Sequence, residues 1–254
     1  MTMRVALTIG LILMLSSCQQ TKPKEAAKTR VEYFKVDRAT SGNVSGKILF
    51  RGKKPAAKRV DMDEDPQCAK LHKSAVFDTP VAGNKNGTLA NVFVYVKQGL
   101  EGKQFEPRPE AVTMDQKGCW FEPRVLGIQT GQAFRVTNSD PVTHNIHPRP
   151  KANHEWNQSQ PPAEAPLMRK FARPEVMIRV KCNIHPWMHA WVGVVDHPFF
   201  AVTGEDGRFE LANLPPGKYT LEAWQEELGT KQQEVLVAPS GKTTAELIFK
   251  GEEK

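Results

Sequence analysis

Short apolar segments that alternate with polar residues are the feature that most limits the folds open to this chain. Segments such as VSGKILF, LANVFVYV, VMIRVKC and KYTLEAW are short and rich in β-branched or aromatic residues. Asn86-Gly87, Asp206-Gly207 and Pro215-Pro216-Gly217 supply turn residues between such segments. No segment has a sustained helical period. The sequence therefore predicts an all-β protein with sandwich-like sheets.

The N-terminus predicts export. Arg4 precedes an apolar run, Val5–Leu15, that is too short to span a bilayer unaided. The following Leu15-Ser16-Ser17-Cys18 resembles a bacterial lipobox, so residues 1–17 are expected to be a lipoprotein signal peptide and Cys18 the lipidated residue. An ordinary signal peptide is the alternative. We expect an exported, membrane-anchored bacterial lipoprotein that faces the periplasm or the cell surface.

Composition bounds the rest of the chain. Residues 18–43 are polar and rich in Lys, Glu, Thr and Ala, which predicts a flexible tether. The roughly 210 residues that follow suit two domains of about 100 residues each, or one large pair of β-sandwiches. The net charge of +7 is spread along the chain, and its densest basic group, in residues 53–59, has no aromatic platform beside it. No nucleic-acid partner is expected.

One stretch, KCNIHPWMHAW, gathers residues that can bind metal. Alternation along VMIRVKC buries every second residue from Val176 to Cys182, so the thiol of Cys182 points inward at the end of a strand. His185 and Met188 follow on a tight loop. His144, after the strand QAFRVTN, could complete a set of four ligands. The alternative is a core strand in which Cys182 and Met188 only fill space.

The residue types in this set favour one metal. A thiolate, two imidazoles and a thioether are soft ligands that suit copper, and a weak axial sulfur is typical of blue-copper centres. Zinc accepts cysteine and histidine, but a thioether is a poor zinc ligand. A single cysteine in the cluster argues against a dinuclear centre. The expected cofactor is one type 1 copper ion.

The ligand loop and the segment before it resemble cupredoxins of the amicyanin and plastocyanin type. The motif from Cys182 to Met188 has the family's Cys-x-x-His-Pro-aromatic-Met pattern, and Asn138 followed by His144-Asn145-Ile146-His147 is similar to its upstream motif. The resemblance implies a Greek-key β-sandwich with the metal ligands His144, Cys182, His185 and Met188. It also implies that Asn145 fastens the two ligand loops by hydrogen bonds, and that His147 is not a ligand.

The flanking regions resemble another family, the carboxypeptidase regulatory-like (transthyretin-like) β-sandwich. Gly207–Leu211 and Leu214–Tyr219 are similar to its Gly-x-Phe-x-Leu and Leu-Pro-Pro-Gly-x-Tyr motifs, and Val44–Ile48 is similar to its opening strand. The resemblance implies a second sandwich that is split by the cupredoxin. A simple tandem order is the alternative.

The predicted domains are accordingly the first part of the carboxypeptidase regulatory-like domain (44–105), the cupredoxin domain (106–196) and the remainder of the split domain (197–254).

Two further cysteines need an explanation in an exported chain, where idle thiols tend to pair. If Cys18 carries lipid and Cys182 binds metal, a disulfide between Cys68 and Cys119 is the simplest account. A second metal site built from Cys68 and His72 is the alternative.

These features predict a membrane-tethered carrier of single electrons. The resemblance implies that His185 is exposed and passes electrons, with Pro186 and Trp187 as a docking patch, and that the partner is a redox protein such as a dehydrogenase, a cytochrome or an oxidase. We expect no enzyme activity, because Cys182 lacks the adjacent histidine that links copper centres in multicopper oxidases and copper nitrite reductases.

Two other functions stay open. One is copper storage, delivery or sensing, which would use the additional histidines His147, His154 and His189. The other is a structural or carbohydrate-binding surface lipoprotein, with which the transthyretin-like module is compatible.

Overall fold

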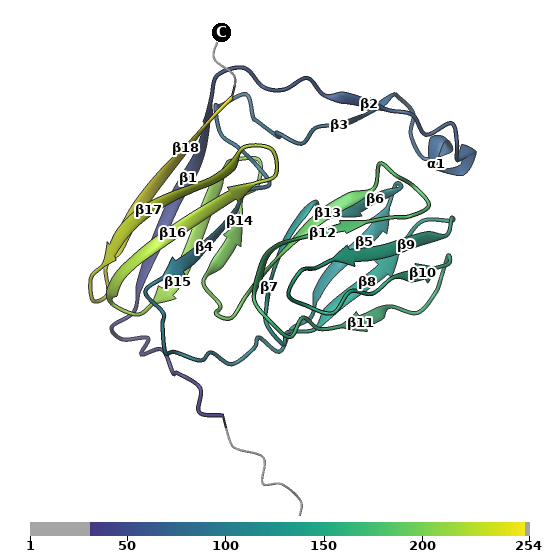
Figure 1. Cartoon of the computed structure of the whole chain (residues 1–254). Helices are drawn as coiled ribbons and strands as arrows, with labels where there is room; N and C mark the ends of the chain where they lie inside the picture. The colour runs from purple at the N-terminus through teal and green to yellow at the C-terminus, as the bar shows by residue number, and fades with distance from the viewer. Residues whose placement is uncertain (1–30, 252–254) are drawn as a thin grey trace, which may run out of the picture. The chain divides into compact units, whose positions relative to one another are not determined.

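The computed structural model describes residues 31–251, and its regular structure is almost entirely β (Figure 1). The predicted all-β class with sandwich-like sheets is confirmed. The predicted signal peptide and Cys18 lie outside the described residues. Within those residues, the one helix is far too short to cross a membrane. The elements are β1 (Gly42–Arg51), β2 (Lys58–Val60), α1 (Pro66–Lys70), β3 (Val76–Asp78), β4 (Phe93–Gln98), β5 (Val112–Lys117), β6 (Trp120–Glu122), β7 (Val125–Gln129), β8 (Phe134–Asn138), β9 (His144–Arg149), β10 (Gln158–Gln160), β11 (Leu167–Arg169), β12 (Glu175–Lys181), β13 (His189–Val195), β14 (Phe200–Val202), β15 (Arg208–Leu214), β16 (Gly217–Gln225), β17 (Gly229–Val237) and β18 (Lys242–Lys250).

Strands from both ends of the described chain share two sheets, which we call the split sandwich. One sheet has the order β15-β1-β18 and the other the order β14-β4-β16-β17. In β15, Phe209 and Leu211 are buried while Arg208 and Glu210 are exposed, as expected for a strand with one face on a core. The chain therefore leaves this sandwich after β4 and forms β5–β13 in other sheets. It then returns with β14–β18 to complete the sandwich that it began with β1.

Residues 112–195 form two other sheets, which we call the inserted sandwich. Their orders are β10-β9-β12-β13-β7 and β11-β8-β5-β6, and their inner faces share one apolar core. Ile178 and Val180 of β12 are buried, as the alternation predicts. Val176 is 36% exposed instead, because the pairing of β12 with β13 shifts register between Glu175 and Ile178.

The chain between β1 and β4, residues 52–91, departs from the sequence-based prediction. This bridging segment carries β2, α1 and β3, and its Met62 and Cys68 are buried in the core of the inserted sandwich. Met62 and Cys68 therefore join a different core from the one expected for residues 44–105, whereas Val81 and Leu89 of the same segment lie in the core of the split sandwich. A disulfide joins Cys68 to Cys119, in the turn between β5 and β6, and so fastens the bridging segment to the inserted sandwich.

The last part of the predicted flexible tether (residues 18–43) contacts the split sandwich. The backbone N–H of Phe34 donates to the carbonyl of Gln104 at 2.6 Å, and its ring packs edge-on against Phe105. Val36 packs on the apolar core of the split sandwich. From Phe34 onward the chain thus contacts the split sandwich, and the flexibility of residues 18–43 stays a prediction.

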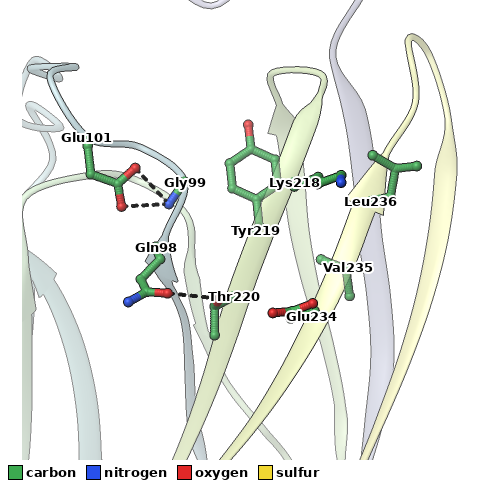
Figure 2. A pocket seen from close by; sticks show the side chains of 9 residues that line it. All are labelled: Gln98, Gly99, Glu101, Lys218, Tyr219, Thr220, Glu234, Val235 and Leu236. Carbon is green, nitrogen blue, oxygen red and sulfur yellow. Dashed lines mark hydrogen bonds between the residues drawn. The ribbon is translucent and has the colours of Figure 1, made fainter.

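An open groove lies along β16 and β17 of the split sandwich (Figure 2). Four of its lining residues pair with one another: Glu101 accepts from the backbone N–H of Gly99 at 2.9 Å, and the hydroxyl of Thr220 donates to Gln98 at 3.2 Å. No group of three metal-binding side chains among the described residues includes a residue of this groove. The candidate chemistry lies in the inserted sandwich.

Candidate metal centre

The hairpin between β12 and β13 holds three of the predicted ligands in one tight loop. The backbone N–H of Cys182 donates to the carbonyl of Met188 at 3.1 Å, and that of Met188 donates to the carbonyl of His185 at 3.0 Å. The exposed fractions of Cys182, His185 and Met188 are 3%, 1% and 0%. The loop closes on itself and turns these side chains inward.

The turn between β8 and β9 delivers the fourth predicted ligand. Asn138, at the end of β8, accepts the backbone N–H of Asp140 at 3.0 Å and donates to the carbonyl of Val142 at 2.9 Å. These bonds replace strand pairing in the turn and fix its shape. His144 then begins β9 and is completely buried.

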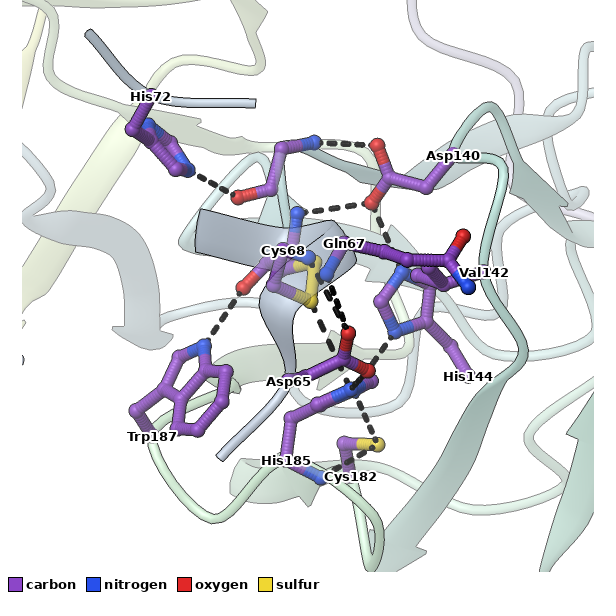
Figure 3. The surroundings of a disulfide bond; sticks show 12 residues. Asp65, Gln67, Cys68, His72, Asp140, Val142, His144, Cys182, His185 and Trp187 are labelled. Atoms are coloured by element: carbon purple, nitrogen blue, oxygen red, sulfur yellow. Dashed lines mark hydrogen bonds and ion pairs between the residues drawn. A yellow bond between two sulfur atoms is a disulfide. The ribbon is translucent and has the colours of Figure 1, made fainter. Parts of the chain in front are cut away.

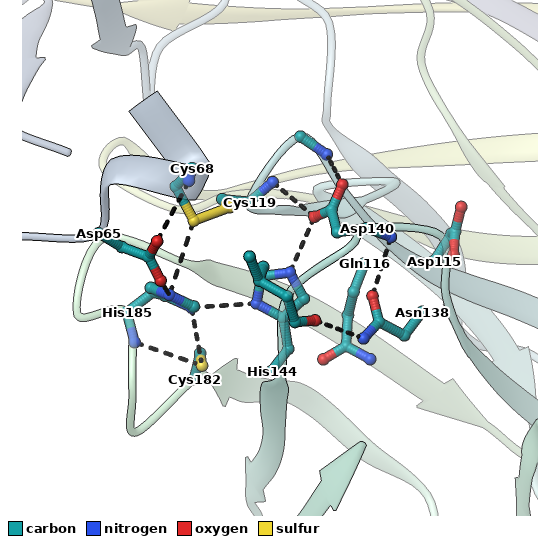
Figure 4. A network of polar contacts seen from close by, with 12 residues as sticks. Asp65, Cys68, Asp115, Gln116, Cys119, Asn138, Asp140, His144, Cys182 and His185 are labelled. Carbon is teal, nitrogen blue, oxygen red and sulfur yellow. Dashed lines mark hydrogen bonds and ion pairs between the residues drawn. A yellow bond between two sulfur atoms is a disulfide. The ribbon is translucent and has the colours of Figure 1, made fainter. Parts of the chain in front are cut away.

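Three donor atoms meet at one point (Figure 4). Nδ1 of His144 lies 3.0 Å from Nδ1 of His185, and the latter lies 3.7 Å from Sγ of Cys182. All three atoms lie within 4.8 Å of one another. The structure thus brings together residues that are up to 41 positions apart, and Met188 is buried at the end of the same loop. Their role as ligands stays a prediction.

Each imidazole has a carboxylate on its outer nitrogen. Oδ2 of Asp140 lies 2.8 Å from Nε2 of His144, and Oδ2 of Asp65 lies 3.0 Å from Nε2 of His185. An ionised carboxylate only accepts hydrogen bonds, which assigns a proton to each Nε2. The two Nδ1 atoms can then lie 3.0 Å apart only around a shared cation, either a proton or a metal ion. The donor set therefore fits a soft metal cation.

The charges of the cluster agree with that fit. Burial raises the pKa of the Cys182 thiol, but hydrogen bonds from His144, His185 and backbone N–H groups outweigh burial and lower this pKa to about 6. For Asp140 too, burial raises the pKa, and the hydrogen bonds from His144 and from backbone N–H groups outweigh it, so the pKa is lowered. A thiolate is the form of cysteine that binds metals.

His185 is not the exposed electron port that the resemblance implied. Asp65, in the bridging segment, covers its outer edge, and Sγ of Cys68 lies 3.6 Å from its Nε2 (Figure 3). Trp187 is half-buried, and its indole N–H donates to the carbonyl of Cys119 at 3.0 Å. The expectation is wrong because the bridging segment, which the sequence placed elsewhere, lies against this loop.

Asn145 contacts both ligand loops. Its side-chain oxygen accepts the backbone N–H of Asn183 at 3.1 Å, and its own backbone N–H donates to Sγ of Cys182 at 3.4 Å. Its side-chain amide also contacts Asn157. These are the kind of contacts expected of a residue that ties the two loops together.

The other histidines do not join the cluster. His147 pairs with a nearby carboxylate at 2.7 Å, His189 pairs with a guanidinium at 2.7 Å, and His154 is exposed. The alternative second site is contradicted, because Cys68 is in a disulfide and His72 contacts a backbone carbonyl at 2.8 Å. Among residues 31–251, every group of three donors close enough to hold a metal contains His144 or His185.

Sequence reasoning missed Asp65 and Asp140. Asp65 carried a local signal, since an Asp followed by Pro is a typical helix start, and it caps α1. Asp140 stands four residues before His144. Neither signal points to an imidazole, because the contacts depend on the tertiary fold.

Comparison with curated protein sequences gave no match. A family profile described as polysaccharide lyase family 4, domain II, matches residues 191–246, a range that contains β14–β17 of the split sandwich.

Some solved structures are similar to part of this chain. A copper-containing nitrite reductase (NirK) from Thermus scotoductus SA-01 is 22% identical, with a TM-score of 0.31; the likeness covers 38% of this chain and 24% of that one. For a purple cupredoxin from Nitrosopumilus maritimus the values are 20% identity, TM-score 0.28, and 33% and 98% coverage. For a methionine-to-glutamine mutant of amicyanin with Cu(I) they are 21%, 0.30, and 33% and 81%. The chain thus spans about a quarter of the nitrite reductase. Because these similarities are weak, the nature of the site is inferred from its donor atoms alone.

Proposed function

We propose that His144, Cys182, His185 and Met188 hold one copper ion and that the protein carries single electrons between redox partners outside the cytoplasm. The observation that carries the proposal is the meeting of two Nδ1 atoms and one thiolate in a buried position. This soft donor set, with a thioether on the same loop, favours copper. When bound, copper supplies a Cu(II)/Cu(I) couple.

The chain's own residues fix the donor atoms. Sγ of Cys182 accepts two backbone N–H groups, from Asn145 and His185, both at 3.4 Å. The loop is closed by the bond between Cys182 and Met188. Because these bonds do not depend on the charge of a bound metal, we expect the donors to move little when the oxidation state changes. A site of that kind suits electron transfer.

Burial supports a carrier more than an enzyme. A catalytic metal site keeps an open position for water or substrate, whereas the donor residues here are almost completely buried. Storage would be favoured by separate groups of donors, and those found among the described residues all share His144 or His185. The proposed partner is a redox protein such as a dehydrogenase, a cytochrome or an oxidase.

The proposal includes export and a lipid anchor on Cys18. Replacement of Cys18 by Ala should move the protein from the membrane fraction to the soluble exported fraction of a bacterial host, while the copper site is unchanged. Retention of the Cys18→Ala protein on membranes would contradict the anchor.

The proposed copper site is tested on the chain from residue 19 onward, loaded with Cu(II). We expect an intense visible band from thiolate-to-copper charge transfer and a narrow copper hyperfine splitting in the EPR spectrum. Cys182→Ser should abolish both, and His154→Ala, an exposed histidine outside the cluster, should change neither. A weak signal that is indifferent to Cys182→Ser would refute the blue-copper assignment.

A further inference from the structure

Two carboxylates and one disulfide form a continuous chain of contacts around the candidate metal centre (Figure 4). Each carboxylate faces Nε2 of one candidate ligand histidine, and each also accepts a backbone N–H from one half of the disulfide. The disulfide joins the two halves. The two carboxylates that contact the imidazoles are therefore connected to each other through one disulfide.

Asp140 makes the contacts on the His144 side. Its Oδ2 accepts the backbone N–H of Cys119 at 2.8 Å and faces Nε2 of His144 at 2.8 Å. Its Oδ1 accepts the backbone N–H of Gly118 at 2.6 Å. With both oxygens engaged and the side chain buried, this carboxylate has a fixed orientation toward the ring.

Asp65 makes the contacts on the His185 side, although it lies 120 residues away in the chain. As the N-cap of α1, its Oδ1 accepts the backbone N–H of Gln67 at 2.9 Å and that of Cys68 at 3.3 Å. Its Oδ2 is left to face Nε2 of His185 at 3.0 Å. The disulfide keeps α1, and with it Asp65, against the ligand loop.

We propose that Asp65 and Asp140 are positioning residues, and that the Cys68–Cys119 disulfide holds them so that both imidazoles turn Nδ1 toward the metal and the copper site has a lowered reduction potential. Only the part of this proposal that concerns the reduction potential rests on the proposed copper function. The orientation of the two imidazoles does not. The bridging segment, which the sequence-based prediction assigned to the split sandwich, then contributes to the metal centre of the inserted sandwich.

Two physical effects act in the same direction. A carboxylate on the outer nitrogen fixes the ring and raises the basicity of the nitrogen that binds the metal. Two negative charges near the site also stabilise the more positive oxidation state. Both effects strengthen Cu(II) binding more than Cu(I) binding, which lowers the reduction potential.

The first experiment compares Asp65→Asn with Asp63→Asn. Asparagine preserves the helix cap, so Asp65→Asn removes the charge and replaces the acceptor that faces Nε2 of His185 with an N–H donor. Asp63 is an exposed neighbour that faces no imidazole. We expect Cu(II) affinity to fall about 10–100-fold in Asp65→Asn. If the Cu(I) affinity falls tenfold less than the Cu(II) affinity, the reduction potential of this one-electron couple rises by about 59 mV. Asp63→Asn should match the wild type. An unchanged potential and Cu(II) affinity in Asp65→Asn would overturn the electrostatic half of the proposal.

The second experiment needs no copper and tests the positioning alone. Long-range proton–nitrogen NMR spectra of the histidine rings in the metal-free protein should show protonated Nε2 on both His144 and His185. The proton population on Nε2 of His185 should fall in Asp65→Ala and in the double variant Cys68→Ala/Cys119→Ala. Spectra that are the same in all three proteins would overturn the positioning role. If the wild type forms no thiolate–copper complex, the proposed function fails while these spectra still decide the positioning.

Discussion

The two sandwiches bury different kinds of residue. The split sandwich has an apolar core, and the polar side chains that it buries, among them Thr203, Glu222 and Gln225, belong to no group of three metal-binding donors among the described residues. The inserted sandwich has a comparable apolar core but also buries Cys182, two imidazoles and the carboxylate of Asp140. Such polar groups tolerate burial only when they are paired, and of the buried side-chain polar atoms in residues 31–251 a single oxygen, on Gln116, lacks a partner. Buried polar groups depend on partners in both sandwiches but, within the described part of the chain, a thiol and two imidazoles converge on one point only in the inserted sandwich.

The largest effects should come from removing one core aromatic in each sandwich. Phe249 in β18 and Phe134 in β8 are both completely buried, so Phe→Ala should reduce the free energy of unfolding by about 3–5 kcal/mol in each case. We expect only Phe134→Ala to alter the copper spectrum, because β8 leads into the turn before His144. Guanidinium unfolding and the visible spectrum measure the two effects. A changed spectrum in Phe249→Ala would show that the sandwiches are not separable in function.

The disulfide should have the next largest effect on stability. It joins residues 51 positions apart, so its loss in Cys68→Ala/Cys119→Ala should reduce the free energy of unfolding by about 4 kcal/mol through the greater freedom of the unfolded chain. Urea unfolding of this variant and of Cys182→Ala, which leaves the disulfide intact, provides the measurement. A loss below about 1 kcal/mol, well under the usual range, would mean that the other contacts of the bridging segment suffice to hold it.

Alternation and loop spacing predicted much of the inserted sandwich. The buried face of β12, with Ile178 and Val180, follows from period-2 alternation, and Cys182, His185 and Met188 share a loop because they are close in the sequence. Val176 does not follow the alternation of buried and exposed residues. The register shift beside it depends on the partner strand and cannot be recognised in the sequence of β12 itself.

The bridging segment could not be predicted in the same way. Its strands are only three residues long, so they carry too little periodicity to indicate which core they join. Asp65 had a readable local role as a helix cap, but its second partner, His185, is chosen by the tertiary fold. The expected exposure of His185 failed for the same reason, because the residues that cover it lie far away in the sequence.

The junction of the two sandwiches should give a pH-dependent effect. Glu226 accepts from Arg124 of the inserted sandwich at 2.6 Å and from the indole N–H of Trp191 at 3.0 Å. Burial raises the pKa of Glu226, but hydrogen bonds from His189 and Arg124 outweigh burial and lower this pKa to about 2. A carboxyl whose pKa is lower in the folded state stabilises the protein above its ordinary pKa, and that stability is lost as the pH falls.

We therefore expect on the order of 3 kcal/mol of stability to disappear as the pH falls from about 4.5 to about 2. Glu226→Gln should be less stable than the wild type near neutral pH, and the difference should shrink over this range. Unfolding curves at several pH values measure it, with the exposed neighbour Glu227→Gln as the control. A difference that does not depend on pH would show that the charge of Glu226 contributes little.

The smallest effects should come from two matched asparagines, one in each sandwich. The side-chain oxygen of Asn145 accepts the backbone N–H of Asn183 at 3.1 Å, and that of Asn43 accepts the backbone N–H of Asn213 at 3.0 Å. Because each substitution by alanine removes an acceptor from one backbone N–H, each should reduce the free energy of unfolding by about 1 kcal/mol. Only Asn145→Ala should shift the visible copper band, because the side-chain bond that it removes holds Asn183, the residue next to Cys182. An equal shift in Asn43→Ala would mean that the split sandwich tunes the metal centre, and the division between support and function would then have to be abandoned.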